Sequence, residues 1–485
     1  MNDPNGPVYD PVHGFYHMFY QDHLALPNEG AGSGPVYGHA VSRDLTKWAR
    51  LPVAIWNDKP YDSVAIFTGS ATVVNGKMVQ MYPGICDKKR YDNCVTGTNF
   101  NLAFPTNPDS DPLYHNWTKY ENNPVVNNTQ RDPSTAWKTE YGEWRLTSYD
   151  TTTYGSKDFR SWYEIGKNKD FPEGECPSFF EFPRVVDRVN SSSPKTIFPT
   201  HVHKASISRK DWMQVGTWQD GKPGQTGSFT PTPGFDFNRK IIDAGDFYAS
   251  KDFYDPLKKR RINYGWATVS PGSTLSLPRE VVWSQQMSQL LYLPLEEQKA
   301  LRGDTIVSVR SKTVQNFFAT GANEKFQQSE AFVELEIPPE SGTFGTIAFA
   351  GGSPSSPLGI YFFVVYSEAT KACMESEKED ICSTEVGAIG PSGNAPLFKD
   401  VLKLSPSDKT ITFQIFSDQT FTECYWQGGR VVMTVNNLQQ SGKGQMPGDH
   451  LAVKSSTSGP IVVKNMEAWS VGSIWVSPEE VLQSR

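Results

Sequence analysis

The chain contains 485 residues, which is more than one ordinary domain needs and enough for two or three domains with well-buried cores. Charged residues make up 20% and the formal net charge is −7, so the composition excludes a basic surface for nucleic acid or an anionic membrane. Aromatic residues reach 13%, a content that suits β cores and also the stacking of neutral sugar rings. The sequence contains no run of about 18 apolar residues, so no transmembrane helix is predicted.

The chain opens with Met-Asn-Asp-Pro-Asn-Gly, which places the carboxylate of Asp3 just before the first strand-like run. Proline fixes its own φ, while Asn5 and Gly6 tolerate left-handed backbone geometry. These residues predict a sharp turn that aims the side chain of Asp3. Ordinary exposed turns use the same residue types, so this carboxylate alone does not identify a site.

Short β-prone segments follow, separated by clusters of Gly, Pro, Asn and Asp. Asn75-Gly76 lies between two such segments and predicts a two-residue β-hairpin. Helical periodicity is nearly absent, and the one short helix is predicted at Pro294–Arg302, where we place a domain boundary. The predicted strands of this part are 14–21, 71–74, 77–82, 144–147, 196–203, 212–218, 246–249 and 262–269. Many short strands without helices predict a propeller or a sandwich.

After residue 303, the segments 331–337, 359–365, 411–416 and 429–435 alternate as half-buried strands do and favour a sandwich. This part contains no catalytic constellation, so we expect it to pack against the first domain. Six cysteines are present in the whole chain. Their spacing is compatible with two small disulfide loops and two unpaired thiols: Cys86 with Cys94, Cys373 with Cys382, and Cys176 and Cys424 alone.

Two further carboxylates stand beside prolines, Asp132 in Arg-Asp-Pro and Glu175 in Glu-Cys-Pro. They are 43 residues apart, about the length of one four-stranded propeller blade. A propeller brings such distant residues together because the innermost strand of every blade lines one central channel. Glu173 has the same chemistry as Glu175, and in an extended segment it would point to the same side, so spacing alone does not separate them.

The order Asn-Asp-Pro-Asn-Gly, Arg-Asp-Pro and Glu-Cys, together with Phe-Thr-Gly-Ser-Ala-Thr at 67–72 and Phe-Tyr-Ala-Ser at 247–250, resembles glycoside hydrolase family 32. This family comprises invertases, inulinases, levanases, fructan exohydrolases and fructosyltransferases. The resemblance implies an all-β fold, with a five-bladed β-propeller at 1–296 followed by a C-terminal β-sandwich at 303–485. Family members normally carry a Trp before the Met and a further strand upstream, so an amino-terminal strand of the propeller is expected to be missing.

The resemblance also implies a retaining β-fructofuranosidase that removes terminal β-D-fructofuranosyl residues from sucrose or fructans. Such enzymes use two carboxyl groups. By matching position, Asp3 is the nucleophile, Glu175 the acid and base, and Asp132 the transition-state stabiliser, which Arg131 helps to keep ionised. The residues expected to bind substrate are Asn2, Gln21, Tyr37, Phe67, Thr68 and Arg131. No cofactor and no metal are expected, because metal-ligand spacing and phosphate loops are absent.

The chain departs from the family pattern around the entrance of the expected pocket. Tyr37 and Phe180 replace residues that are Trp and Tyr in many members, and the Gly-rich segment Asp22–Pro35 looks like an insertion. The Asp with which sucrose-preferring plant members hold glucose has no clear match in Lys204–Asp211. The preference among sucrose, inulin and levan therefore stays open.

Two alternative functions remain beside hydrolysis: a fructosyltransferase that makes fructans from sucrose, and an inactive relative that only binds fructans. The intact set of three carboxylates argues against the second. The expected partner is sucrose or a fructan, with no nucleic acid and no membrane. A secreted or vacuolar location follows mainly from the resemblance, since the chain shows no signal region and its N-x-S/T sequons at Asn116, Asn127 and Asn190 can arise by chance.

Overall fold

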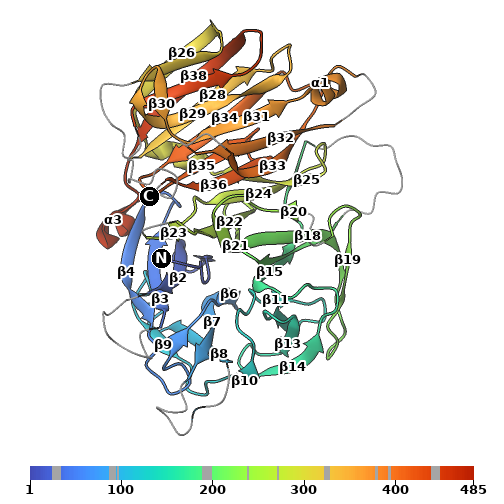
Figure 1. Cartoon of the computed structure of the whole chain (residues 1–485). Coiled ribbons are helices and arrows are strands. Elements are labelled where there is room, and N and C mark those ends of the chain that lie inside the picture. The colour runs from blue at the N-terminus through green and yellow to red at the C-terminus, as the bar shows by residue number, and fades with distance from the viewer. Residues whose placement is uncertain are drawn as a thin grey trace.

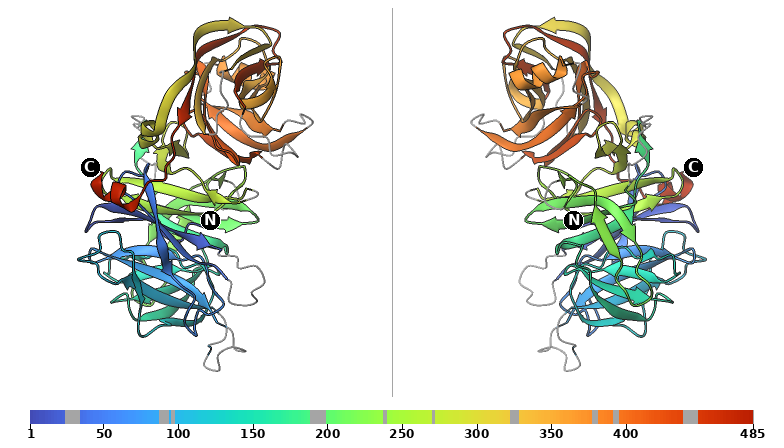
Figure 2. Two further views of the ribbon diagram at one scale, coloured as in Figure 1. Left: turned by 90° about the vertical axis from the view of Figure 1, so that its left-hand side faces the viewer. Right: turned by 90° about the vertical axis from the view of Figure 1, so that its right-hand side faces the viewer.

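The structure is a computed structural model and describes all residues except 24–33, 87–93, 95–97, 188–198, 237–239, 270–271, 322–327, 377–380, 391–394, 438–447 and 485. It consists of a β-propeller and a β-sandwich (Figure 1). Figure 2 shows the sandwich standing on one edge of the propeller, with the C-terminus back beside the propeller. Among the described residues, no helix is long and apolar enough to cross a membrane.

Five sheets surround one centre and form the blades of the propeller (Figure 1). The first is β1 (Val8–Asp10), β2 (Phe15–Asp22), β3 (Val36–Ser42) and β4 (Trp48–Ile55). The second is β5 (Ala65–Ile66), β6 (Ser70–Val74), β7 (Lys77–Ile85), β8 (Thr98–Pro105), β9 (Trp117–Lys119) and β10 (Val126–Thr129). The third is β11 (Trp137–Lys138), β12 (Trp144–Thr147), β13 (Thr152–Ser156) and β14 (Trp162–Lys167).

The fourth blade is β15 (Glu175–Glu181), β17 (His201–Ile207), β18 (Lys210–Gln219), β19 (Ser228–Pro231) and β20 (Lys240–Ile241). The fifth is β16 (Val185–Val186), β21 (Phe247–Asp255), β22 (Arg260–Ala267), β23 (Thr274–Leu275), β24 (Arg279–Ser284) and β25 (Gln289–Pro294). A 3-10 helix, η1 (Glu296–Leu301), then leads out of the propeller, at the place where the sequence predicts a short helix.

Two sheets pack face to face in the sandwich. One contains β26 (Arg302–Val314), β28 (Ser329–Glu336), β34 (Thr410–Ser417), β35 (Phe421–Trp426), β36 (Val431–Asn436) and β38 (Ile461–Val471). The other contains β27 (Phe317–Gly321), β29 (Gly342–Ser353), β30 (Ser356–Leu358), β31 (Tyr361–Tyr366), β32 (Cys382–Ile389), β33 (Pro396–Leu404) and β37 (His450–Ser455). Alternate residues of β34 are buried, as the sequence pattern predicts, and they enter one large apolar core.

Two short α-helices, α1 (Glu368–Met374) and α3 (Pro478–Gln483), lie outside the sheets. Ser477 caps α3 and forms a capping box with Glu480. The two disulfides that the cysteine spacing suggests are both formed, and Cys176 and Cys424 are free and buried.

The Asn-Gly hairpin prediction is confirmed. Val74 pairs with Lys77, and Asn75 and Gly76 have φ of 50° and 79°, as a turn that matches the strand twist requires. The strand predicted at 196–203 begins later, at His201. Residues 196–198 of the predicted segment lie outside the described ranges. Most of the segment 22–35 and the sequon at Asn190 also lie outside them.

The sharp reversal predicted at the amino end is not formed, although the backbone does bend at Asp3. Residues 2–5 lie beside β2: the amide of Asn2 donates to the carbonyl of Gln21, and the amide of Asn5 to that of Phe19, at 3.0 and 2.7 Å. Gly6 does not have a left-handed backbone, and is needed for a different reason. A Cβ atom on Gly6 would lie 2.7 Å from the amide nitrogen of Ala71 in the second blade. The segment that carries Asp3 is thus part of the first blade and lies tightly against the second.

Candidate functional site

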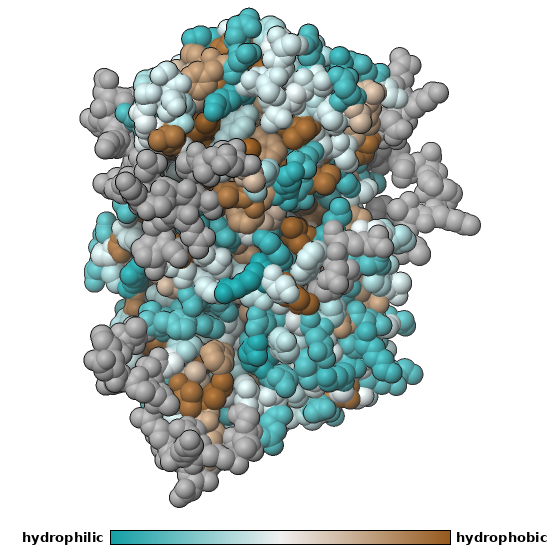
Figure 3. Space-filling model, in the orientation of Figure 1, coloured by the Kyte–Doolittle hydropathy of each residue, from teal (hydrophilic) through white to brown (hydrophobic). Residues whose placement is uncertain are grey.

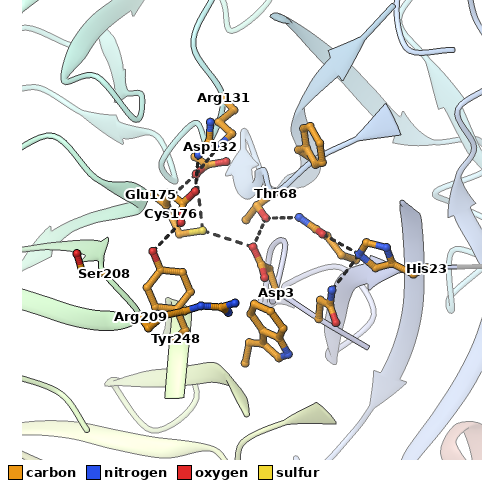
Figure 4. Close-up of a pocket in the computed structure, with 14 residues that line it drawn as sticks. Asp3, His23, Thr68, Arg131, Asp132, Glu175, Cys176, Ser208, Arg209 and Tyr248 are labelled. Atoms are coloured by element: carbon orange, nitrogen blue, oxygen red, sulfur yellow. Dashed lines mark hydrogen bonds and ion pairs between the residues drawn. The ribbon is translucent and has the colours of Figure 1, made fainter. Parts of the chain in front are cut away.

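A pocket of about 600 Å³ lies at the centre of the propeller, a size typical of small-molecule sites. All five blades contribute to its wall, and most of the lining residues are polar (Figure 4). The residues that line it are Asn2, Asp3, Gln21, His23, Phe67, Thr68, Arg131, Asp132, Glu175, Cys176, Ser208, Arg209, Tyr248 and Trp266.

On the face of the molecule shown in Figure 3, the described hydrophobic residues form small patches separated by hydrophilic ones.

Asp3 enters the pocket from the extended segment beside β2. Thr68 of the second blade donates a hydrogen bond of 2.6 Å to Asp3 Oδ2, and Gln21 Nε2 in turn donates to Thr68 Oγ1 at 2.6 Å. Burial raises the pKa of Asp3, the hydrogen bond from Thr68 opposes that rise, and the nearby charge of Glu175 adds to it. The chain Gln21–Thr68–Asp3 therefore fixes one carboxylate oxygen and the direction of the side chain.

Asp132 enters from the third blade with φ of 62°, a left-handed conformation that is uncommon for a residue other than glycine. The side chain is buried, and its Oδ2 accepts a 2.9 Å hydrogen bond from the amide of Cys176. Burial raises the pKa of Asp132 to about 6, while the Cys176 amide and the charges of Lys251 and Arg131 work against this rise. The site thus holds a carboxylate that changes its charge close to neutral pH.

Glu175 begins β15 on the fourth blade and faces the same pocket (Figure 4). Arg131 Nη2 donates to Glu175 Oε1, and the Tyr248 hydroxyl donates to Glu175 Oε2 at 2.6 Å. The two donors come from the third and fifth blades, so both neighbouring blades orient this carboxyl group. Its side chain is 34% exposed, which leaves it accessible from the pocket.

The structure distinguishes Glu175 from Glu173. The Glu173 side chain is 61% exposed, lies outside the pocket lining and pairs with Lys167 at 3.3 Å. Spacing along an extended strand does not apply here, because β15 begins only at Glu175. Three carboxylates from three different blades, Asp3, Asp132 and Glu175, therefore meet in one pocket, where such groups can serve as general acid, general base or nucleophile.

Five of the six residues expected to bind substrate line the pocket: Asn2, Gln21, Phe67, Thr68 and Arg131. Tyr37 does not. It is fully buried, and its hydroxyl donates to the carbonyl of Phe67 at 3.0 Å, so it lies behind the wall and supports Phe67. Matching Tyr37 to the rim of the family pocket did not reveal that its side chain, which is smaller than the Trp of many members, is buried in this protein.

Sequence reasoning assigned no site role to six lining residues: His23, Cys176, Ser208, Arg209, Tyr248 and Trp266. Tyr248 belongs to the Phe-Tyr-Ala-Ser motif that carries part of the resemblance, so a signal was present without a role. Ser208 and Arg209 form the two-residue turn between β17 and β18, with φ of 52° and 63°. The guanidinium of Arg209 lies 5.6 Å from the centre of the Trp266 ring, so the two form one side of the pocket.

Within the part of the chain that the structure describes, no group of three or more His, Cys, Asp or Glu side chains is arranged to hold a metal ion. The described pocket offers carboxylates, hydroxyls, amides, guanidinium groups, an imidazole, a thiol and the aromatic rings of Phe67, Tyr248 and Trp266 as its chemical groups.

Residues 1–303 match the family model described as "Glycosyl hydrolases family 32 N-terminal domain". The chain is 30% identical to "Acid beta-fructofuranosidase 2, vacuolar" of a Rosa hybrid cultivar, over 90% of this chain and 74% of that protein. It is 29% identical to "Acid beta-fructofuranosidase" of Vigna radiata, over 99% of this chain and 79% of that protein.

Among solved structures, the chain is similar to fructan 1-exohydrolase IIa from Cichorium intybus. The TM-score is 0.77 at 24% identity, and the match covers 98% of this chain and 96% of that one. At this identity the similarity concerns the fold, and the propeller and sandwich described above correspond in architecture to that enzyme.

Proposed function

This chain belongs to glycoside hydrolase family 32 and is a glycoside hydrolase, and on this premise we propose that it is a retaining β-fructofuranosidase. It would release terminal β-D-fructofuranosyl residues through a fructosyl-enzyme intermediate. The observation that carries the proposal is the meeting of Asp3, Asp132 and Glu175 in one central pocket. Relatives named acid beta-fructofuranosidases support the choice of substrate.

In the first step, Asp3 attacks the anomeric C2 atom of the fructosyl unit. The bond between C2 and the bridging oxygen breaks, and protonated Glu175 gives its proton to that oxygen, so the leaving sugar departs as a neutral alcohol. Thr68 fixes the attacking carboxylate, and Arg131 and Tyr248 orient Glu175. The product of this step is an ester between Asp3 and the fructosyl unit.

In the second step, ionised Glu175 accepts a proton from water, and the hydroxide attacks C2. The ester bond breaks, Asp3 leaves as a carboxylate, and fructose is released. The two hydrogen bonds that Glu175 accepts in the free protein suit its ionised form in this step. Asp132 would accept hydrogen bonds from fructose hydroxyls, which strengthen as positive charge develops on the ring.

Retention requires roughly 5–5.5 Å between the two reacting carboxyl groups, whereas inversion requires roughly 6.5–9.5 Å. The Sγ of Cys176, the residue next to Glu175, lies 3.7 Å from Asp3 Oδ2, which supports a close approach of the two sides. Proton NMR on the first turnover tests this point. We expect fructose to appear first with the configuration of the substrate, and the opposite configuration would exclude a nucleophilic role for Asp3.

The leaving sugar would lie on the side of the pocket formed by Ser208, Arg209 and Trp266. None of these three lining residues carries a carboxylate. An indole face and guanidinium donors suit neutral sugar rings with their hydroxyl groups. We therefore propose that both sucrose and short fructans are accepted, with water rather than a second sugar as the acceptor.

Product analysis after incubation with sucrose, inulin and levan tests the activity. We expect equal amounts of glucose and fructose from dilute sucrose and free fructose from the fructans. A large excess of glucose with accumulating trisaccharide would make the chain a fructosyltransferase. Binding of fructans without any cleavage would make it an inactive relative.

We further propose that the protein works in the vacuole or outside the cell. One relative is named vacuolar, and the two disulfides are typical of an oxidising compartment. Asn116 and Asn127 are exposed, as glycosylation at their sequons requires. Mass spectrometry of the protein from its native source tests this: glycans at these two residues are expected, and unmodified peptides would argue against secretion.

A further inference from the structure

Two motifs carry the pocket carboxylates of the third and fourth blades, Arg131–Pro133 and Glu175–Pro177. In each motif, the residue just before the proline has a left-handed backbone conformation. Asp132 has φ of 62° and Cys176 has φ of 48°. For residues other than glycine this conformation is costly, by about 1–3 kcal/mol, and persists where surrounding contacts hold it. The contacts that hold these two residues therefore decide where the carboxylates of Asp132 and Glu175 point.

One buried ammonium group connects the two motifs. Lys251 is 1% exposed, and its Nζ donates to the carbonyl of Pro133 at 3.4 Å and to that of Pro177 at 3.2 Å. These prolines directly follow the two left-handed residues. Lys251 therefore reaches the same backbone position in both motifs and ties the third blade to the fourth from β21 in the fifth.

Lys251 reaches this place because β21 is irregular. The register of β21 against β22 shifts between Tyr248 and Lys251, and Ala249 in between has φ of 53°. A bulge of this kind re-aims side chains that regular alternation would send to opposite faces. As a result, Tyr248 contacts Glu175 while Lys251, three residues on, lies beneath the same motif.

A second ammonium group holds the neighbouring carbonyl. Lys204 of β17 is 2% exposed, and its Nζ donates to the carbonyl of Cys176 at 2.8 Å and lies 3.6 Å from Asp211 Oδ2. The pairing of β15 with β17 is interrupted between Glu175 and Ser178, so regular ladder bonds do not serve this stretch. The two lysines supply hydrogen bonds at the place where the ladder stops.

From this geometry, and resting on the proposed function, we infer that Lys251, with Lys204 beside it, is a positioning residue for catalysis. It holds the Arg131–Pro133 and Glu175–Pro177 segments in one relative arrangement, so that Asp132 and Glu175 face the same fructosyl unit. An apolar side chain would fill the volume at lower desolvation cost, since burying an ammonium group costs several kcal/mol. The charge and the donors are therefore what the site uses.

The charge of Lys251 also acts on Asp132. The charged groups that face Asp132 are Arg131 and Lys251, which favour its ionised form, and Asp3, which opposes it. Burial raises the pKa of Asp132 to about 6, and the lysine keeps that pKa from rising further. Removal of the ammonium group is therefore expected to move the loss of activity at low pH to a higher pH.

The substitution Lys251→Met tests this because it keeps an unbranched chain and removes both donor and charge. We expect kcat to fall by roughly 100-fold with KM changed less than about threefold, because ground-state binding is largely retained. The acid limb of the pH profile should move up by about one unit. Lys251→Gln restores a neutral donor, so it should recover part of kcat while the acid limb stays displaced.

Lys210→Met is the matched control. Lys210 of β18 is half-buried and its Nζ also bridges two backbone carbonyls, those of Ala244 and Gly245, away from the pocket. Its loss should lower the melting temperature and leave kcat and the pH profile unchanged. If Lys251→Met folds and keeps the wild-type kcat and pH profile, or if Lys210→Met changes them equally, Lys251 has no positioning role.

A readout without activity separates this inference from the proposed function. The backbone amide of Cys176, which donates to Asp132 Oδ2, should exchange with deuterium faster in Lys251→Met and Lys204→Met, while the amide of Cys424 in β35 of the sandwich serves as internal reference. Peptide mass spectrometry gives the two rates. Unchanged exchange of the Cys176 amide in both folded variants overturns the inference, whereas a wild-type protein that cleaves no fructoside overturns the proposed function alone.

Discussion

At the scale of single residues, the pocket separates Glu173 from Glu175, two glutamates that spacing along the chain alone leaves equivalent. Glu175→Gln removes the proton donor and should lower kcat on sucrose by at least about 1,000-fold, and Asp3→Asn should do the same by removing the nucleophile. Glu173→Gln is the matched control, because Glu173 is exposed outside the pocket. Steady-state kinetics with thermal melts checks all three. Wild-type turnover in either pocket variant contradicts the assigned roles.

The pKa of Asp132 gives a second prediction, concerning stability. A carboxyl group whose pKa is raised from 3.8 to about 6 binds its proton more tightly in the folded state, so stability falls as pH rises through this range. Asp132→Asn cannot ionise and should increase the free energy of unfolding at pH 7 by on the order of 2 kcal/mol. The gain should vanish near pH 4, while activity is lost at both values.

Urea unfolding of Asp132→Asn and wild type at pH 4 and pH 7 measures this difference. Asn keeps the shape of Asp132 and an oxygen for the Cys176 amide, so packing changes little. A gain of equal size at both pH values would mean that burial of the charge is not its cause.

Local sequence points to the three carboxylates that line the pocket because each lies in a motif of several residues, but it identifies only some of the groups that orient them, Thr68 and Arg131. Tyr248, Lys204 and Lys251 come from other strands, and bulges decide where they point. A bulge depends on how two strands pair, which a single segment does not specify. The prediction for Tyr37 fails for a related reason: only the fold shows that its side chain is fully buried, with its hydroxyl on the Phe67 carbonyl.

At the scale of elements, the amino-terminal segment shows where local rules fail. Pro, Asn and Gly favour a reversal of the chain, yet backbone pairing with β2 keeps residues 2–5 beside that strand, with only a bend at Asp3. The Asn75-Gly76 hairpin, in contrast, is predictable because only these two residues separate the paired residues Val74 and Lys77. Elements whose geometry is set by neighbours in sequence are predictable, and those set by distant strands are not.

Gly6→Ala tests the close approach at this segment. The new Cβ would lie 2.7 Å from the Ala71 amide nitrogen, so the segment that carries Asp3 must shift away from the second blade. We expect a loss of about 1–3 kcal/mol in unfolding free energy and a clear fall in kcat. Gly272→Ala is the control, because among the described residues no atom other than those of its chain neighbours lies within 4 Å of its Cβ position. Equal behaviour of the two variants in melts and kinetics would contradict the tight contact.

At the scale of the whole molecule, a buried ionic cluster joins propeller and sandwich. Arg279 is fully buried, and its Nη2 contacts Asp243 at 2.9 Å and Glu423 of the sandwich at 3.3 Å. Thr434, also of the sandwich, donates to Asp243 at 2.8 Å. Removing one side would leave buried charges without partners, which is strongly destabilising. This supports the expectation that the second part of the chain serves to pack against the first.

The carboxy-terminal tail makes a second connection, from the end of the sandwich back to the first blade (Figure 2). The amide of Trp48 in β4 donates to the carbonyl of Ile474 at 2.7 Å, and the amide of Val476 donates to the carbonyl of Trp48 at 3.0 Å. Val481 of α3 is 1% exposed and enters an apolar cluster of the first blade and its surroundings, formed by Phe15, Val41, Ala49 and Leu113. The tail therefore covers the outer side of the blade whose inner edge carries Asp3.

Val481→Asp would place a charge in this cluster and should detach α3, at a cost of about 3–5 kcal/mol, because an unpaired buried charge is strongly unfavourable. The neighbouring Leu482 is 43% exposed, so Leu482→Asp serves as the control and should change stability by less than about 0.5 kcal/mol. Because the tail lies on the outer side of the blade and supplies none of the residues that line the pocket, kcat of the folded Val481→Asp protein should stay close to wild type. Calorimetric melts with kinetics at a temperature below the transition measure both quantities. Equal melting temperatures of the two variants would mean that the tail contributes nothing to the stability of the first blade. A fall in kcat of folded Val481→Asp would mean that the outer side of the blade also sets the position of Asp3.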